Sequence, residues 1–230
     1  MNKRKRFLFV SPHPDDAELA IGGTILKLKK QGHKVFLADL TSGEPTPYGT
    51  EEKRKKESMA ADRILKIDRR YNLRLENRYL FDDLRARRLL AEKIRLIRPD
   101  ILFCPFDADA HPDHVSASRI AEAARFYAKF SKVRMKGKPH YPPLLLYFFP
   151  SHLRVFPKAS FFVDISLEFK AKMKAVRAYR SQFVDNPNNR FVFDYIESMN
   201  EYFGHLIRSR YAEPLFSREV LKLDDLSSLL

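Results

Sequence analysis

The 230-residue sequence predicts an α/β protein in which helices cover both faces of a mainly parallel sheet. Short apolar runs alternate with stretches of helical spacing along most of the chain, and this alternation is typical of such a sheet. Hydrophobic residues make up 44% of the sequence, which is enough for a substantial core. No linker, repeat or low-complexity stretch divides the chain, so we expect one domain over residues 1–230.

The first two predicted strands each lead into a helix. The apolar strand Lys5–Val10 is followed by helical spacing over Asp16–Gln31. The pair Gly22-Gly23 interrupts this helix, which indicates close packing of its backbone against another element. The second strand, Val35–Leu40, precedes a segment rich in turn formers and then a helix over about Thr50–Lys66.

Two more strand-and-helix units follow. A short strand near Tyr71–Leu75 leads through a loop to the helix Asp82–Arg98, which Pro99 ends. The apolar strand Ile101–Phe106 precedes a helix over about Val115–Lys129. These four units together predict the parallel part of the sheet.

The last third of the chain contains two further strands and two helices. The strands are expected at Leu144–Phe149 and Phe161–Ile165. Glu168–Phe183 carries apolar residues on one helical stripe and predicts a single helix. The segment Phe191–Arg210 is expected to be largely helical.

The charge and hydropathy of the sequence indicate what class of protein it encodes. The formal charge of +14 suggests a nucleic-acid-binding protein without catalysis as an alternative of a different class. The Lys and Arg residues are dispersed over helices without a recognisable binding motif, so we favour a solvated basic surface that attracts anionic substrates. No run of about 18 apolar residues exists, and Phe7–Val10 is too short for a signal peptide. We therefore expect a cytoplasmic protein that binds neither nucleic acid nor a membrane.

Two short clusters, His13-Pro14-Asp15-Asp16 and His111-Pro112-Asp113-His114, each follow a predicted buried strand. Ligands of open α/β sheets bind in the crevice beyond the carboxyl ends of the strands, so both clusters can reach one pocket. Imidazole and carboxylate are ligands of catalytic zinc. Either cluster alone is explained as well by helix capping, but the pair favours a metal site.

The residue types in the clusters also supply acid–base groups. One of Asp15 and Asp16 can bind the metal while the other remains free to take a proton from water, and the residues alone do not say which. His111 and His114 are three residues apart and can point into one crevice. Asp113 is available to accept a hydrogen bond from an imidazole and orient it.

The two clusters, with Ala17-Glu18 and Gly22-Gly23-Thr24 after the first, resemble the PIG-L/LmbE-like zinc-dependent deacetylases. The likeness runs over most of the chain. Among the branches of this family, the sequence looks most like the bacillithiol-pathway deacetylases, which hydrolyse N-acetylglucosaminyl malate. Other members act on glucosaminyl-inositol compounds or chitobiose.

The resemblance implies a Rossmann-like fold and a hydrolase that cleaves the amide of an N-acetylated amino sugar. Asp15 would be the general base toward the attacking water. His111, braced by Asp113, would be the acid that faces the tetrahedral intermediate. A Zn²⁺ ion, for which Fe²⁺ could substitute, would be held by His13, Asp16 and His114.

The resemblance also implies substrate contacts and an assembly. Two positions depart from the family pattern: Asn77 stands where an aspartate is expected, and Ala110 stands where bacillithiol-type members often carry arginine. The substrate therefore stays open between N-acetylglucosaminyl malate, a chitooligosaccharide and a sugar-thiol conjugate. Relatives form homo-oligomers, often trimers or hexamers. The side chains expected to contact the substrate are Arg54, Asn77 and Tyr195.

Overall fold

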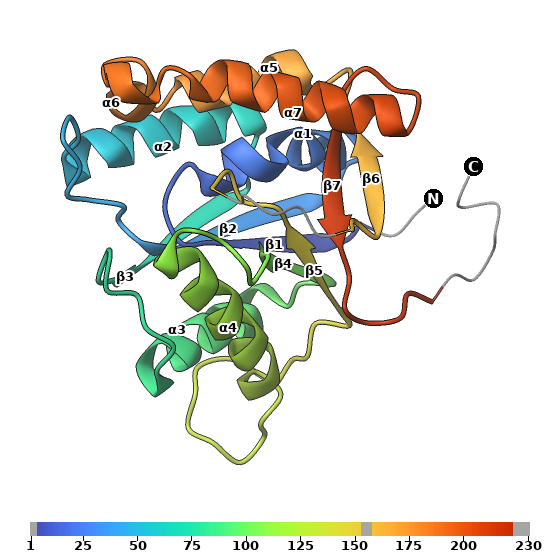
Figure 1. The fold of residues 1–230 in the computed structure, drawn as a ribbon. Helices are drawn as coiled ribbons and strands as arrows, with labels where there is room; N and C mark the ends of the chain where they lie inside the picture. Colours follow the sequence, from blue (N-terminus) through green and yellow to red (C-terminus); the bar gives the residue numbers. More distant parts are fainter. Residues whose placement is uncertain (1–3, 153–157, 223–230) are drawn as a thin grey trace.

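The computed structural model describes residues 4–152 and 158–222, and seven strands of these residues form one sheet. The strands follow the order β3-β2-β1-β4-β5-β7-β6 across the sheet (Figure 1). Their bounds are β1 Arg6–Ser11, β2 Lys34–Thr41, β3 Arg69–Leu75, β4 Ile101–Pro105, β5 Leu144–Phe148, β6 Phe161–Asp164 and β7 Ala212–Phe216.

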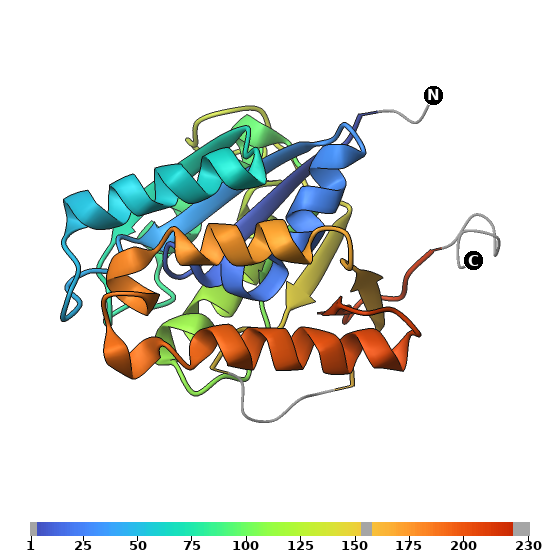
Figure 2. The ribbon, with the colours of Figure 1, turned by 90° about the horizontal axis from the view of Figure 1, so that it is seen from above.

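Helices cover both faces of the sheet, as the sequence predicts. One face carries α3 and α4, and the other carries α1, α2, α5 and α7 (Figure 1). Seen from above in Figure 2, α5 lies between α2 and α7. Among the described residues, none of these helices is long and apolar enough to span a bilayer. Their bounds are α1 Asp16–Lys30, α2 Glu51–Leu65, α3 Leu84–Ile97, α4 Pro112–Tyr127, α5 Phe169–Arg177, α6 Arg180–Phe183 and α7 Val192–Leu206.

The direction of the parallel strands β1 to β5 determines where the candidate site lies. β1 lies between β2 and β4 and pairs with both in parallel. Its alternate residues are buried on opposite faces, with Phe7 and Phe9 in one apolar cluster and Leu8 and Val10 in the other. Because β1 and β4 run in the same direction, the loops that follow them meet at one edge of the sheet.

The C-terminal part differs from the sequence prediction in two respects. β7 was not predicted, and it inserts between β5 and β6 and pairs antiparallel to both. The single helix predicted over Glu168–Phe183 is divided into α5 and α6, because the backbone leaves helical geometry at Tyr179. The Tyr179 side chain is fully buried, and its hydroxyl donates a hydrogen bond of 2.8 Å to Glu18 Oε1. The predicted apolar stripe is therefore buried even though the helix is interrupted.

A buried carboxylate on β7 holds α1 in place. Glu213 accepts hydrogen bonds from the backbone N–H groups of Gly23, at 2.9 Å, and Thr24, at 2.7 Å. Its charge is paired with the fully buried ammonium of Lys172, 2.7 Å away on α5. A Cβ at Gly23 would lie 2.7 Å from Ile165, so the close backbone packing predicted for Gly22-Gly23 is confirmed.

Candidate metal centre

The first His/Asp cluster forms the turn from β1 into α1. His13 Nδ1 lies 3.1 Å from Asp16 Oδ2, and the same oxygen accepts the backbone N–H of His13 at 3.0 Å. Asp15 precedes the helix with a φ of 117°, in the left-handed region that few residues other than glycine adopt. This backbone angle turns the Asp15 carboxylate away from that of Asp16, so the two neighbouring acids face different partners.

The second cluster begins α4 and reaches the first. His114 Nε2 lies 3.3 Å from Asp16 Oδ1, and the rings of His13 and His114 have centroids 5.6 Å apart. The ring of His111 stacks on that of His114 at 4.8 Å. Residues about 100 positions apart in the sequence thus meet beyond the ends of β1 and β4.

Three buried side chains could hold a divalent metal. Ligand atoms of His13, Asp16 and His114 all lie within 4.8 Å of one another. The ring nitrogens of His114 are buried and face carboxylate oxygens of Asp16 and Asp109, an environment that suits an imidazole bound to a cation. Two imidazoles and a carboxylate are a known ligand set for catalytic zinc.

A second set of ligand atoms, from His13, His111 and Asp113, is equally compact. The carboxylate of Asp113 already accepts backbone N–H groups of Arg78, at 2.8 Å, and Leu80, at 3.3 Å. His111 Nδ1 accepts the backbone N–H of Asp113 at 3.2 Å. All three side chains of the set with His114 are buried, whereas His111 is only partly buried, so the set with His114 is the better candidate.

The contacts of Asp113 correct one expectation. Its carboxylate lies 3.1 Å from His13 Nε2, so it orients His13 and does not brace His111. A carboxylate that the sequence reasoning missed, Asp109, lies 3.2 Å from His114 Nδ1 and accepts the backbone N–H of His111 at 2.7 Å. Its place between β4 and the second cluster is the signal that could have revealed it.

The carboxylates around His13 and His114 stabilise positive charge in this part of the protein. Burial opposes protonation of His13, but hydrogen bonds to Asp113 and Asp16 outweigh it and raise its pKa to about 9. Burial likewise opposes protonation of His114, and the charge of Asp16 raises its pKa to about 10. A cation that replaced these protons would meet the same stabilising carboxylates.

Asp15 and His111 lie beside this set with different proton affinities. Burial raises the pKa of Asp15 to about 7, against the opposing charge of Arg54. Burial and the charges of His114 and His13 lower the pKa of His111 to about 4. Asp15 is therefore a carboxylate whose proton affinity suits transfer near neutral pH.

Arg54 has a different principal contact from the one predicted. Its side chain is only 5% exposed, and Nη1 donates a hydrogen bond of 2.9 Å to Asp15 Oδ2. Nε lies 3.6 Å from Glu44 Oε1. Arg54 reaches the pocket wall, but its guanidinium is bound to these two acids, so its structural effect is to orient Asp15.

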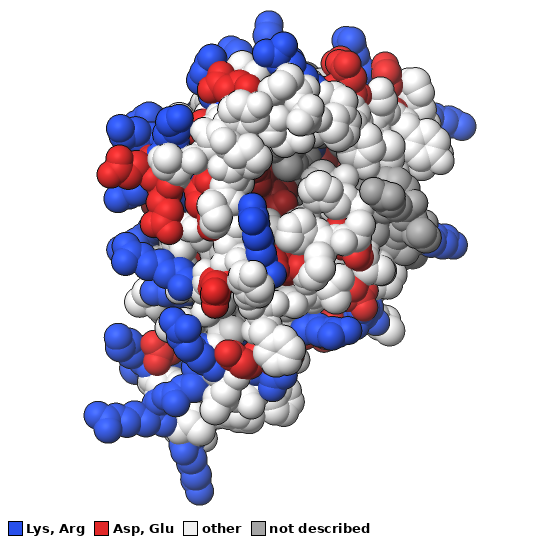
Figure 3. All heavy atoms as spheres, turned by 60° about the vertical axis from the view of Figure 1, so that its left-hand side comes forward, with Lys and Arg blue, Asp and Glu red and all other residues white. Residues whose placement is uncertain are grey.

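A cavity of about 540 Å³ lies beside the ligand cluster, and its lining includes Asn77 and Tyr195, two of the side chains expected to contact the substrate. The face shown in Figure 3 has a hollow with acidic side chains inside it and a basic side chain beside it. His152, which follows β5, was missed, and its ring lies 5.6 Å from that of His114. The rule that placed the other clusters, a polar residue just beyond a parallel strand, could have found it.

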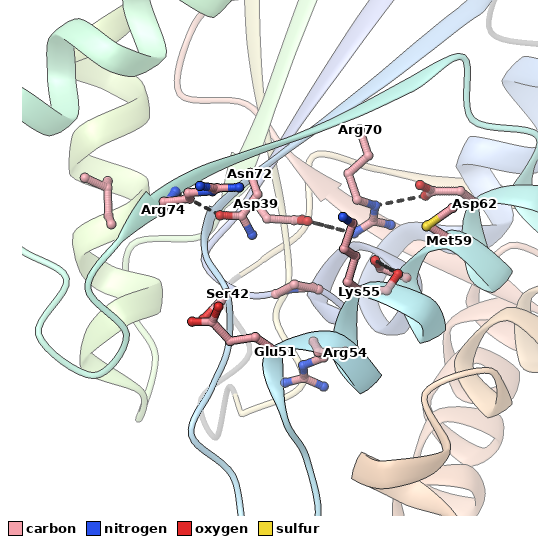
Figure 4. A pocket seen from close by; sticks show the side chains of 13 residues that line it. Asp39, Ser42, Glu51, Arg54, Lys55, Met59, Asp62, Arg70, Asn72 and Arg74 are labelled. Atoms are coloured by element: carbon pink, nitrogen blue, oxygen red, sulfur yellow. Dashed lines mark hydrogen bonds and ion pairs between the residues drawn. The ribbon is translucent and has the colours of Figure 1, made fainter.

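A second cavity of about 550 Å³ lies between α2 and strands β2 and β3 (Figure 4). Arg70 on its floor donates hydrogen bonds of 3.1 Å to Asp39 and 2.9 Å to Asp62, and it also pairs with Glu18. These groups pair with one another and connect α1, α2, β2 and β3. The network therefore supports the helix that carries Arg54.

The family model described as PIG-L, GlcNAc-PI de-N-acetylase, matches residues 8–125, which are more than half of the chain and include all three candidate metal ligands. The chain belongs to the PIG-L family. The members of this family are metal-dependent N-deacetylases, so the enzyme class expected from the sequence is confirmed. The family assignment also confirms the resemblance on which the expected chemistry depends.

Individual relatives of this PIG-L protein support the assignment. A diacetylchitobiose deacetylase of Thermococcus kodakarensis is 28% identical over 226 residues, which cover 92% of this chain and 82% of that protein. A 1D-myo-inositol 2-acetamido-2-deoxy-alpha-D-glucopyranoside deacetylase of Thermomonospora curvata is 30% identical over 53% of this chain and 52% of that protein. The crystal structure of a conserved protein from Thermus thermophilus is 38% identical, with a TM-score of 0.87, and covers 96% of this chain and 98% of that chain.

Proposed function

We propose that this protein is a zinc-dependent hydrolase that removes the N-acetyl group from a small molecule containing N-acetylglucosamine. The observation that carries the proposal is a buried set of His13, Asp16 and His114 with a further buried acid, Asp15, that is not a member of the set. Zinc bound by these three side chains would polarise the acetyl carbonyl and make water acidic enough to attack it at neutral pH.

The side chains around the metal set have different roles in the proposed reaction. Asp15 takes a proton from the attacking water, and Arg54, which donates to Asp15 Oδ2 at 2.9 Å, keeps this carboxylate in position. His111 lines the same cavity and has Nδ1 occupied by the Asp113 N–H, which leaves its other nitrogen for the reacting groups. A neutral His111 carries its proton on that nitrogen, so we assign it to donate a hydrogen bond to the tetrahedral intermediate, and we assign Asp113 to the orientation of His13.

The proposed substrate class follows from the cavity and the relatives. The two named relatives act on diacetylchitobiose and on an N-acetylated glucosaminyl inositol, which both contain the same acetylated sugar. A cavity of about 540 Å³ is in the range that encloses a molecule of that size. Asn77, Thr46 and Gln182 supply amide and hydroxyl groups for sugar hydroxyls, and Tyr195 supplies an aromatic wall. N-acetylglucosaminyl malate is our first candidate and diacetylchitobiose the second.

The test combines metal analysis with a substrate panel. Purified protein is stripped with a chelator, reloaded with Zn²⁺ or Fe²⁺, and incubated with N-acetylglucosaminyl malate, diacetylchitobiose and an acetylated sugar-thiol conjugate. We expect free amine and acetate to appear in equal amounts, and only with metal. Failure of all three substrates with the metal-loaded protein, or equal turnover by the stripped protein, would contradict the proposal.

A further inference from the structure

Two of the described arginines, Arg54 and Arg78, line the cavity of the candidate metal centre, and they differ in their contacts with acids. Arg54 is buried and bonded to Asp15. Arg78 is exposed, and its side chain donates one hydrogen bond, of 2.7 Å from Nη2 to the carbonyl of Pro45. Within residues 4–152 and 158–222, no carboxylate forms an ion pair with Arg78, so most of its donors face solvent and the cavity.

The backbone of Arg78 is fixed to the metal-binding residues. Its N–H donates a hydrogen bond of 2.8 Å to Asp113 Oδ2, and Asp113 also contacts His13 at 3.1 Å. The backbone of Arg78 has a φ of 69°, in the left-handed region, where a residue other than glycine is held at a cost. A strained residue anchored in this way keeps its Cα at a constant place relative to the reacting centre.

Among the described residues that line the cavity, those outside the site itself and other than Arg78 are uncharged. Thr46, Gln182 and Asn189 offer neutral hydrogen-bonding groups, and Phe191 is 63% exposed. Neutral groups of this kind can bind the hydroxyls and the ring of a sugar. The guanidinium of Arg78 adds a planar set of donors that matches a carboxylate or a phosphate.

We propose that Arg78 is a specificity-determining residue that binds an anionic group, carboxylate or phosphate, attached to the N-acetylglucosamine. The enzyme then prefers acidic glycosides to neutral ones. This inference rests on the proposed deacetylase function and extends it, since it assigns recognition of the attached group to Arg78 and leaves Arg54 to hold Asp15.

The experiment compares three substrates that carry the same acetylated sugar: N-acetylglucosaminyl malate, N-acetylglucosamine 1-phosphate and neutral methyl N-acetylglucosaminide. The metal-loaded wild-type protein and the variants Arg78→Gln and Arg78→Lys are assayed for kcat and KM on each. Arg63→Gln is the matched control, because Arg63 is an exposed arginine on α2 outside the cavity. The ratio of kcat/KM on an acidic substrate to kcat/KM on the neutral one is the quantity of interest.

We expect the wild-type ratio to exceed one and to fall about tenfold or more in Arg78→Gln, mainly through KM, because a charged hydrogen bond is lost. Arg78→Lys should retain part of the preference, and Arg63→Gln all of it. The acidic substrate with the larger loss identifies the anion that Arg78 binds. A wild-type ratio of one, or equal ratios in wild type and Arg78→Gln, would overturn this inference while the deacetylase function stands. Failure of the enzyme on every substrate would overturn both.

Discussion

Asp15 and Asp16 are adjacent in the sequence, yet the fold gives them different environments. Asp16 begins α1 and lies between two imidazoles, which lower its pKa well below the usual range despite its burial. Asp15 has a φ of 117° and faces Arg54. The sequence predicts that one of them stays free, but it cannot say which, because the choice depends on a backbone angle and on an arginine about 40 residues away.

Replacement of Asp15 by Asn tests its assignment as the base. Asn has a similar shape and tolerates the left-handed backbone region, so we expect the fold and the metal content to be retained. Turnover should fall by about 100-fold or more, because the amide cannot take the proton. Metal analysis, thermal unfolding and kcat are measured on the same preparation. Turnover near that of the wild type would remove Asp15 from this role.

His114 and His111 form a matched pair for identifying the ligand set. We expect His114→Ala to lose most of its bound zinc after dialysis, since it removes a ligand of the set with His13 and Asp16. His111→Ala should retain zinc near one equivalent, since its ring lies outside that set. Zinc retained in His114→Ala but lost in His111→Ala would instead assign the metal to His13, His111 and Asp113.

At the scale of elements, the local apolar pattern predicted the first ten described helices and strands, β1 to β6, with small errors at their ends. These elements have simple apolar periodicity, so the side chains that the sequence predicts to be buried are those that the fold buries. β7 was missed because Glu213 and Pro214 interrupt its apolar pattern. Glu213 is buried there only because Lys172, Gly23 and Thr24 meet it from other elements. Such a partner cannot be read from a short window of sequence.

The buried pair of Lys172 and Glu213 predicts a large effect on stability. We expect Lys172→Met to lower the free energy of unfolding by about 3–5 kcal/mol, because the carboxylate of Glu213 is then buried without its cation. Denaturant unfolding gives this quantity. Lys174→Met, on the exposed side of the same helix, should change it by less than about 0.5 kcal/mol. Equal losses in the two variants would contradict the role of the pair.

At the scale of the whole molecule, basic residues are in excess, but several acids are buried. The chain carries a formal charge of +14, and the face in Figure 3 has basic and acidic side chains around its periphery and acids inside its hollow. Arg70 pairs with three acids, of which Glu18 and Asp39 are buried and Asp62 is partly buried. The net charge was predictable from composition, but the burial of these acids depends on tertiary packing.

Because of the Arg70 network, we expect the free energy of unfolding to depend on pH. Burial raises the pKa of Asp39 to about 7, well above its value in an unfolded chain. Between these two pKa values the folded state binds the additional proton, so the contribution of Asp39 to stability falls as pH rises, by up to about 1.4 kcal/mol per pH unit. We expect the difference in unfolding free energy between wild type and Asp39→Asn to fall from about pH 5 to about pH 7 and then level off. A constant difference over that range would contradict the raised pKa.

The contact between Glu213 and the backbone of Gly23 and Thr24 has a consequence for biosynthesis. During translation, α1 leaves the ribosome long before β7, so the helix that begins with Asp16 lacks its buried anchor until nearly all of the described chain has been made. A nascent polypeptide interrupted before residue 213 would then lack the support that sets its first His/Asp turn. Metal capture would accordingly occur late, after the last strand has joined the sheet, and prematurely terminated products would compete poorly for the ion.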